Sequence, residues 1–131
     1  MDKPHRKLNV WKKSISLVKE VYAITCSFPK SEEYGHKNQI RRCSVSIAAN
    51  IAEGSARKTT KDKIHFYIIS RGSISELDTL ITISLELGFI NNLQSDSVNK
   101  SVIEIDKMLS GLIKSLENKY KISRFFHLTF N

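Results

Sequence analysis

The chain has few of the residues that end or bend regular structure. Its 131 residues include two prolines and five glycines, and the glycines stand singly at positions 35, 54, 72, 88 and 111. A β-sandwich or barrel needs many turns, so these counts disfavour both. The isolated glycines also exclude a glycine-rich phosphate-binding loop. The composition therefore indicates a mostly helical protein.

Cysteines and long apolar runs are also scarce. Cys26 and Cys43 are the only cysteines, which is too few for a disulfide scaffold or a structural zinc site. No stretch approaches the roughly 18 apolar residues that span a membrane. The first 15 residues contain five Lys or Arg and no apolar segment of a secretory signal. We therefore expect a cytoplasmic protein with no membrane partner.

Length and patterning favour one domain over residues 1–131. Hydrophobic residues make up 40% of the chain, which is enough for a core, and a second domain of normal size is excluded. Apolar residues recur at helical spacing in four segments, which predicts helices over about 9–27, 36–54, 60–87 and 96–118. Residues 1–7 and 119–131 lack clear periodicity and are predicted to be terminal tails. Four such helices with short connections indicate an all-α, antiparallel up-down-up-down four-helix bundle.

Positive charge is concentrated in two regions of the sequence. The net charge is +8, and most of the excess lies in residues 1–13 and 30–63. In an up-down bundle, the start of the first helix, the end of the second and the start of the third share one end. The basic residues expected there are Arg6, Lys7, Lys12, Lys13, Arg57, Lys58, Lys61 and Lys63. Such an end favours binding of nucleic-acid phosphates, and the alternative is a solvated, solubilising charge.

The second predicted helix carries two apolar sides. Ile47 and Ile51 belong to the main stripe, while Val45, Ala48 and Ala52 form a weaker stripe roughly opposite. A single bundle cannot cover both sides equally well, so we expect a homo-oligomer. Gly72 lies inside the third helix, where glycine costs about 1 kcal/mol relative to alanine. We expect close helix packing to compensate for it.

Polar residues near the predicted core suggest a hydrogen-bond network. Glu76 falls at the edge of the apolar arc of the third helix, and a carboxylate at a core border needs a donor. Asn50 and Glu53 are neighbours on the second helix. The candidate network comprises Trp11, Arg42, Asn50, Glu53 and Glu76. It is either a structural network that sets helix register or a ligand site.

Catalytic and metal chemistry find little support. Glu33-x-x-His36 has a metal-ligand spacing, but it lies at a loop–helix junction and has no second copy on a facing helix. Cys43 lies on an apolar stripe, which indicates a core residue rather than a nucleophile. We therefore expect no catalytic residues, no metal site and no cofactor.

Several motifs resemble one bacterial family. They are Val10-Trp11-x-x-Ser14, Tyr34-Gly35-x-x-x-Gln39-Ile40-Arg41-Arg42, Asn50-Ile51-Ala52-Glu53-Gly54 and Gly72-Ser73-x-x-Glu76-Leu77. In this order, across residues 8–118, they resemble the 23S rRNA intervening-sequence proteins, a family that includes the accessory protein of diversity-generating retroelements. The sequence departs from the family at Ala48-Ala49, where Pro-Ser is common, at His36 in place of leucine, and at Asp78 in place of glutamate.

The resemblance implies a four-helix protomer that forms a ring-shaped homopentamer, with a basic surface suited to RNA or DNA and no catalytic residues. Together with the charge pattern, it predicts a non-enzymatic, oligomeric protein that binds nucleic acid through backbone phosphates. The alternative is a protein-interaction scaffold or accessory subunit, for example of a reverse transcriptase, with no direct nucleic-acid role. Salt dependence separates the two, because phosphate binding weakens steeply as salt rises.

Overall fold

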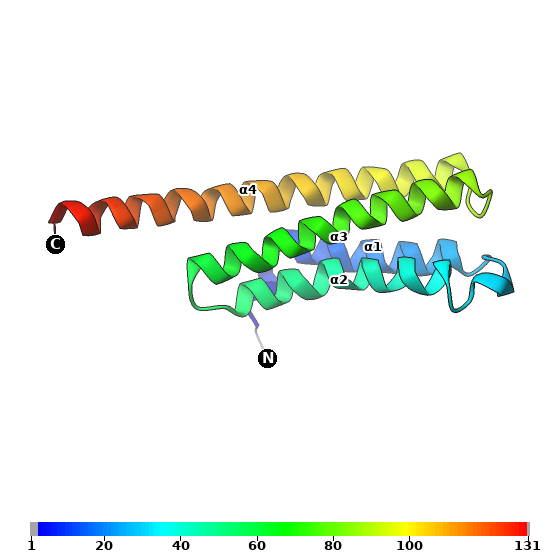
Figure 1. Ribbon diagram of the computed structural model, residues 1–131, viewed down its shortest axis with the longest axis horizontal. Coiled ribbons are helices and arrows are strands. Elements are labelled where there is room, and N and C mark those ends of the chain that lie inside the picture. Colours follow the sequence, from blue (N-terminus) through cyan, green and yellow to red (C-terminus); the bar gives the residue numbers. More distant parts are fainter. Residues whose placement is uncertain (1–2, 131) are drawn as a thin grey trace.

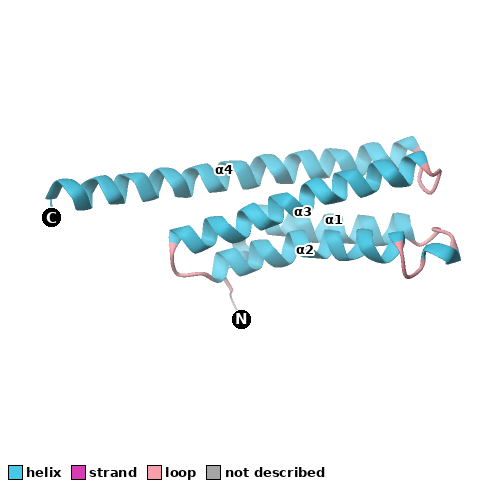
Figure 2. Ribbon diagram, in the orientation of Figure 1, coloured by secondary structure: helices cyan, strands magenta, loops and turns pink. Residues whose placement is uncertain are grey.

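The computed structural model describes residues 3–130 and contains four long helices that lie side by side (Figure 1). They are α1 (Asn9–Thr25), α2 (His36–Ala56), α3 (Thr60–Glu86) and α4 (Asn92–Phe130), with short 3-10 helices η1 (Pro4–Lys7) and η2 (Lys30–Glu32). The described chain contains no strand (Figure 2). The predicted all-α fold with four helices is therefore confirmed.

One core lies between the inner faces of all four helices. Each helix contributes apolar residues three or four positions apart, which places them on a single face. Ten of these side chains are at most 1% exposed: Leu17, Val21, Ile40, Ile47, Ile51, Leu77, Ile81, Val98, Ile105 and Leu109. Burying a side chain of this size is worth about 1.5–3 kcal/mol, so these faces fix how the helices are arranged.

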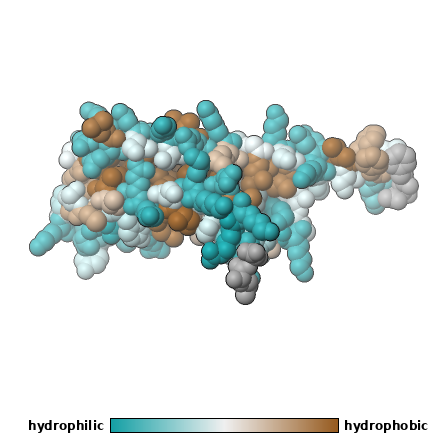
Figure 3. All heavy atoms as spheres, turned by 180° about the vertical axis from the view of Figure 1, so that it is seen from behind, coloured by the Kyte–Doolittle hydropathy of each residue, from teal (hydrophilic) through white to brown (hydrophobic). Residues whose placement is uncertain are grey.

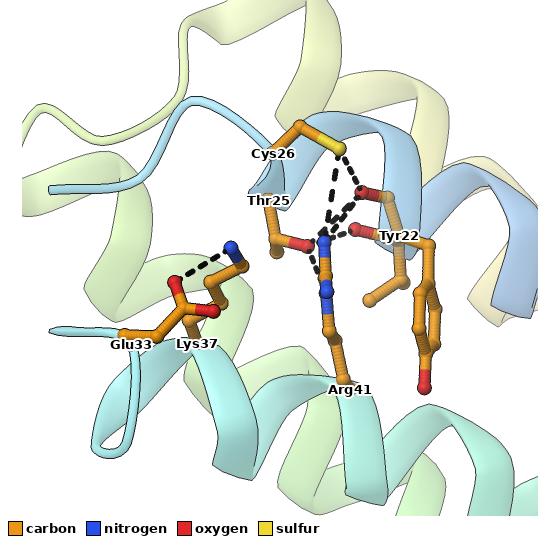
Figure 4. A network of polar contacts seen from close by, with 7 residues as sticks. Tyr22, Thr25, Cys26, Glu33, Lys37 and Arg41 are labelled. Carbon is orange, nitrogen blue, oxygen red and sulfur yellow. Dashed lines mark hydrogen bonds and ion pairs between the residues drawn. The ribbon is translucent and has the colours of Figure 1, made fainter. Parts of the chain in front are cut away.

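Arg41 of α2 holds the C-terminal end of α1 (Figure 4). Its Nε donates to Thr25 Oγ1 at 2.8 Å, and its Nη2 donates to the Tyr22 carbonyl at 3.1 Å. The guanidinium also lies 4.4 Å from the centre of the Tyr22 ring. The last carbonyls of a helix lack partners within the helix and carry partial negative charge, so a cation here satisfies and stabilises them.

The fourth helix is longer than predicted at both ends. It begins at Asn92, not near residue 96, because Asn91 and Gln94 each accept the other's backbone N–H through a side-chain oxygen at 2.9 Å. It then continues to Phe130, where we expected a tail. No proline or glycine follows Gly111 to end it. The apolar periodicity fades after about residue 116, because the helix no longer packs on a core there.

The other termini of the elements also differ slightly from prediction. Residues 4–7 of the expected N-terminal tail form η1, and residues 1, 2 and 131 lie outside the described residues. α2 passes through Gly54, which we expected to end it, and continues to Ala56. Gly54 is buried within the helix, and a Cβ there would lie 2.8 Å from Tyr67 Cε1. This glycine therefore permits close packing of α2 on α3.

Gly72 shows the opposite environment. A Cβ added at Gly72 would meet no heavy atom within 4 Å, so no close helix packing compensates for this glycine within the described chain. The expectation of such packing inside the bundle was wrong. The outer face of α3 is open at this point.

The two glycines make a matched stability test. Gly54→Ala should lower the free energy of unfolding by about 1–3 kcal/mol, because the added methyl group overpacks the contact with Tyr67. Gly72→Ala should raise it by about 0.5–1 kcal/mol, because alanine favours a helix and the site has space. Urea unfolding of the two variants and the parent measures both effects. A Gly54→Ala protein as stable as the parent would contradict the close α2–α3 contact.

Candidate nucleic-acid interface

Segments far apart in the sequence meet at one end of the molecule. Lys3, Pro4 and His5 line a hollow together with Glu53 and Ala56 of α2, so the N-terminal segment lies against the last turns of that helix. The turn from α2 to α3 lies at the same end as the N-terminus (Figure 1). The structure thus brings Arg6 and Lys7 to the same end as residues 57–63.

The fourth helix adds basic residues to this end that the sequence reasoning missed. Tyr120 of α4 lies beside Lys61 and Ile64 of α3, and α4 then continues beyond the start of α3 (Figure 1). The missed residues are Lys114, Lys119, Lys121 and Arg124. The end of a fourth helix must lie where the first helix begins, so the predicted topology itself could have located them. These four residues were missed because residues 119–131 were predicted to be a tail.

The basic end is defined here by twelve residues from four segments. They are Lys3, Arg6, Lys7, Lys12, Arg57, Lys58, Lys61, Lys63, Lys114, Lys119, Lys121 and Arg124. Only Glu53, Asp62 and Glu117 provide acidic groups among the same segments of the described chain. Outside the basic end, the described residues hold nine basic and nine acidic groups. The excess positive charge of the described chain is therefore concentrated at one end.

Some of these cations have partners within the protein. Arg57 is paired with Glu53 at 2.9 Å, and its guanidinium lies 4.5 Å from the centre of the Phe66 ring. Lys63 Nζ donates to the Ser55 carbonyl at 3.1 Å. Both partners of the Arg57–Glu53 pair are about half exposed, and exposed pairs contribute at most about 1 kcal/mol. A phosphate could therefore replace Glu53 at little cost.

Eight lysines of the basic end are exposed and form no ion pair with another described residue: Lys3, Lys7, Lys12, Lys58, Lys61, Lys114, Lys119 and Lys121. Lys13 differs, because its Nζ lies 2.6 Å from Glu104 Oε2 of α4. Its hydrogen bond and positive charge hold the pKa of the Glu104 carboxyl below its usual value. Lys13 therefore joins α1 to α4; it adjoins Lys12 but is not counted among the twelve residues of the basic end.

The expected polar network around Glu76 is not present. Glu76 is exposed and lines an open groove of about 610 Å³ between α2 and α3, together with Arg42 and Gln39. The expectation that Glu76 would be partly buried was wrong, because the apolar arc of α3 is narrower than its sequence indicates. Ile69, two helical turns before Glu76 on the same side of α3, is 39% exposed. The carboxylate therefore faces the groove.

Three of the other four members of that set have separate partners. Asn50 Nδ2 donates to the Ser46 carbonyl at 2.9 Å, Glu53 pairs with Arg57, and the Trp11 ring contacts His5 with a centroid distance of 4.8 Å. These contacts do not join the five residues into one network.

Small hydroxyl side chains, not carboxylates, connect α2 and α3. Ser70 Oγ donates to the Ile47 carbonyl at 2.8 Å, Ser46 and Ser73 hydroxyls lie 3.0 Å apart, and those of Ser55 and Tyr67 lie 2.9 Å apart. The sequence could have indicated these contacts, because serines lie at core positions of two neighbouring helices and a buried hydroxyl needs a hydrogen-bond partner.

Cys43 belongs to the packed interior of this region. The side chain is 5% exposed and its thiol lies 3.1 Å from the Ser73 carbonyl. Burial, and to a lesser extent the nearby Glu76 carboxylate, raises the pKa of the thiol to about 12. The thiol is therefore protonated near neutral pH and is a poor nucleophile. The described residues contain no group of three His, Cys, Asp or Glu side chains placed to hold a metal ion.

Comparisons with known proteins identify relatives of this chain. Residues 6–111 match the family described as 23S rRNA-intervening sequence protein. A crystal structure of a Bacteroides thetaiotaomicron protein of unknown function, from the S23 ribosomal protein family, is similar with a TM-score of 0.74 and 25% identity. The match covers 80% of this chain and 98% of that chain. No curated protein matches. None of the described helices is long and apolar enough to cross a membrane.

Glu76 provides a direct test of the corrected site. Glu76→Ala should change the free energy of unfolding by less than about 0.5 kcal/mol, because exposed side chains without strong contacts contribute little. Tyr67→Phe is the comparison variant, since it removes a buried hydroxyl partner of Ser55 and should cost about 1 kcal/mol. Chemical unfolding of both proteins measures the difference. A larger decrease in stability for Glu76→Ala than for Tyr67→Phe would show that the carboxylate has a structural role after all.

Proposed function

Because the chain belongs to the 23S rRNA-intervening sequence protein family, we propose that it is a non-enzymatic, cytoplasmic, up-down-up-down four-helix bundle that binds RNA or DNA through the phosphate backbone. The basic end is the binding surface. The observation that carries this proposal is its charge, twelve basic residues against three acidic ones. The family's name favours RNA as the first ligand to test.

The chemistry of the basic end suits phosphates more than bases. Lysines dominate it, and an ammonium group binds a phosphate as a point charge, without the directional pairing that reads a base edge. Each phosphate contact releases condensed counterions, which makes the affinity strongly dependent on salt. We therefore propose binding with weak sequence selectivity.

Oligomer formation would multiply this charge. We propose a ring-shaped homopentamer, which rests on the family resemblance and on apolar side chains left uncovered by the protomer. Ile15 of α1 is 38% exposed and Val45 of α2 is 42% exposed, and both line an apolar hollow with Ala49 and Trp11. Several basic ends on one assembly would raise a weak affinity for a long polyanion through avidity.

The oligomer has a simple test. Light scattering on the full chain at micromolar concentration should give five times the 15.0 kDa mass of one chain. Val45→Lys should lower that mass, because it places a charge on the uncovered stripe of α2. Lys19→Gln on the exposed side of α1 should leave it unchanged. A parent protein that remains at the mass of one chain would contradict the proposed assembly.

Salt dependence tests the location of the binding surface. The variant Lys7→Gln, Lys12→Gln, Lys58→Gln, Lys61→Gln removes four unpaired cations from the basic end. It should lower the slope of log affinity against log salt by about 0.7–0.9 for each phosphate that is no longer neutralised. The matched control is Lys19→Gln, Lys30→Gln, Lys100→Gln, Lys107→Gln, which removes the same charge from exposed positions elsewhere. Fluorescence anisotropy with RNA and DNA of about 30 nucleotides measures both slopes.

Two results would contradict the proposal. One is the absence of binding by the parent at low salt. The other is an equal decrease of affinity in the two variants, which would mean that net charge matters and its position does not.

The second candidate function, a protein-interaction scaffold or accessory subunit, is favoured by the uncovered apolar residues Ile15 and Val45. A partner bound through them would dissociate little as salt rises.

A further inference from the structure

The C-terminal part of α4 extends away from the bundle and exposes apolar side chains. It projects beyond the start of α3 (Figure 1), and hydrophobic side chains lie on part of this extension (Figure 3). Phe125 is 62% exposed and Phe126 is 55% exposed. The segment also lies outside residues 6–111, which match the family. It is therefore an addition to the part of the fold that the family match defines.

Aromatic rings and cations alternate on this segment. At about 100° per residue, Ile122, Phe125 and Phe126 share one side of the helix. Lys121 lies one turn before Phe125 and is its neighbour on the helix surface, and Lys119 lies two turns before Phe126 on the same side. The two rings contact each other edge to face, with a centroid distance of 6.1 Å. Cations thus precede the two exposed rings along the helix.

This arrangement continues directly from the basic end. Tyr120, which is 46% exposed, lies beside Lys61 of α3. A nucleic-acid strand bound at Lys58 and Lys61 can therefore continue along α4 toward the two phenylalanines without leaving the positively charged surface. A polyanion also fits this segment better than a second copy of it does, because Lys119, Lys121 and Arg124 of two copies would repel each other.

We infer that the projecting end of α4 is a stacking surface for unpaired bases of a single-stranded nucleic acid. This inference rests on the proposed function and specifies its ligand. The Phe125 and Phe126 rings stack on bases, and Lys119, Lys121 and Arg124 contact the phosphates on either side. Base stacking on aromatic side chains tolerates any sequence, since each base has a π face. A duplex offers its phosphates but keeps its bases inside, so it gains only the electrostatic contacts.

The experiment compares a single-stranded RNA with a blunt-ended RNA duplex of equal phosphate number, which has no unpaired bases. Phe125→Leu, Phe126→Leu keeps apolar side chains but removes the ring faces. It should weaken single-strand binding by about five-fold or more for each base that no longer stacks. Duplex affinity and the salt slope for both RNAs should stay the same, because no cation is changed. Phe125→Tyr, Phe126→Tyr should retain the single-strand affinity, and Tyr34→Leu, an exposed aromatic at the other end, should have no effect.

The outcomes separate this inference from the proposed function. Unchanged single-strand affinity in the leucine variant, with salt-dependent binding retained, would overturn the stacking surface alone. Weaker binding of both RNAs together with a lower mass in light scattering would overturn it too, because it would mean that a second copy covers the rings. Absence of binding to either RNA by the parent would overturn both proposals. Circular dichroism of each variant should match the parent, since the substituted side chains are exposed.

Discussion

The shared core constrains everything else in this structure. Each helix has one apolar face, and the only way for all four to bury these faces is to lie side by side around one core. Leu17, Ile47, Leu77 and Ile105 are each almost fully buried within it. Because the turns between helices are short, this packing also decides which helix ends meet. The position of the charged residues is therefore a consequence of hydrophobic burial.

The two ends of the molecule use their cations differently. At the end where α1 stops, Arg41 donates to the Tyr22 carbonyl and the Thr25 hydroxyl, and Lys37 pairs with Glu33 at 2.9 Å. Along α3 and α4, Arg71 pairs with Asp106 at 3.1 Å. Acidic partners at the basic end are few. Four of the nine cations elsewhere in the described chain contact groups of the protein, and nine acidic residues balance their charge, whereas the basic end leaves charge available for a ligand.

The bounds of a helix were predicted accurately where the helix packs on the core along its whole length. The predicted third helix, 60–87, agrees with Thr60–Glu86 within one residue, because the apolar repeat is regular and Thr59 caps it, accepting the Asp62 N–H at 3.1 Å. The resemblance to the intervening-sequence family was confirmed over residues 6–111. Residues 119–130 were not predicted as helix, because apolar periodicity reports packing and this segment has no core of its own beneath it.

Side-chain roles near the core border were harder to predict. A rotation of a few tens of degrees decides whether Glu76 faces the core or the groove, and periodicity does not resolve such an angle. The same limit applies to Gly54 and Gly72, which look alike in sequence but differ in what lies opposite them. The spacing of residues in the sequence indicates which side of a helix each one lies on. Which residue of a neighbouring helix it contacts depends on how the helices pack.

The most direct test of the central claim is lysine footprinting of the full chain with and without RNA. Acetylation measured by mass spectrometry reports the accessibility of each lysine separately. The account predicts that Lys7, Lys12, Lys58, Lys61, Lys119 and Lys121 become less reactive when RNA binds. Lys19, Lys30 and Lys100 should react as before. Equal protection of both groups, or protection confined to the second, would contradict a nucleic-acid interface at the basic end.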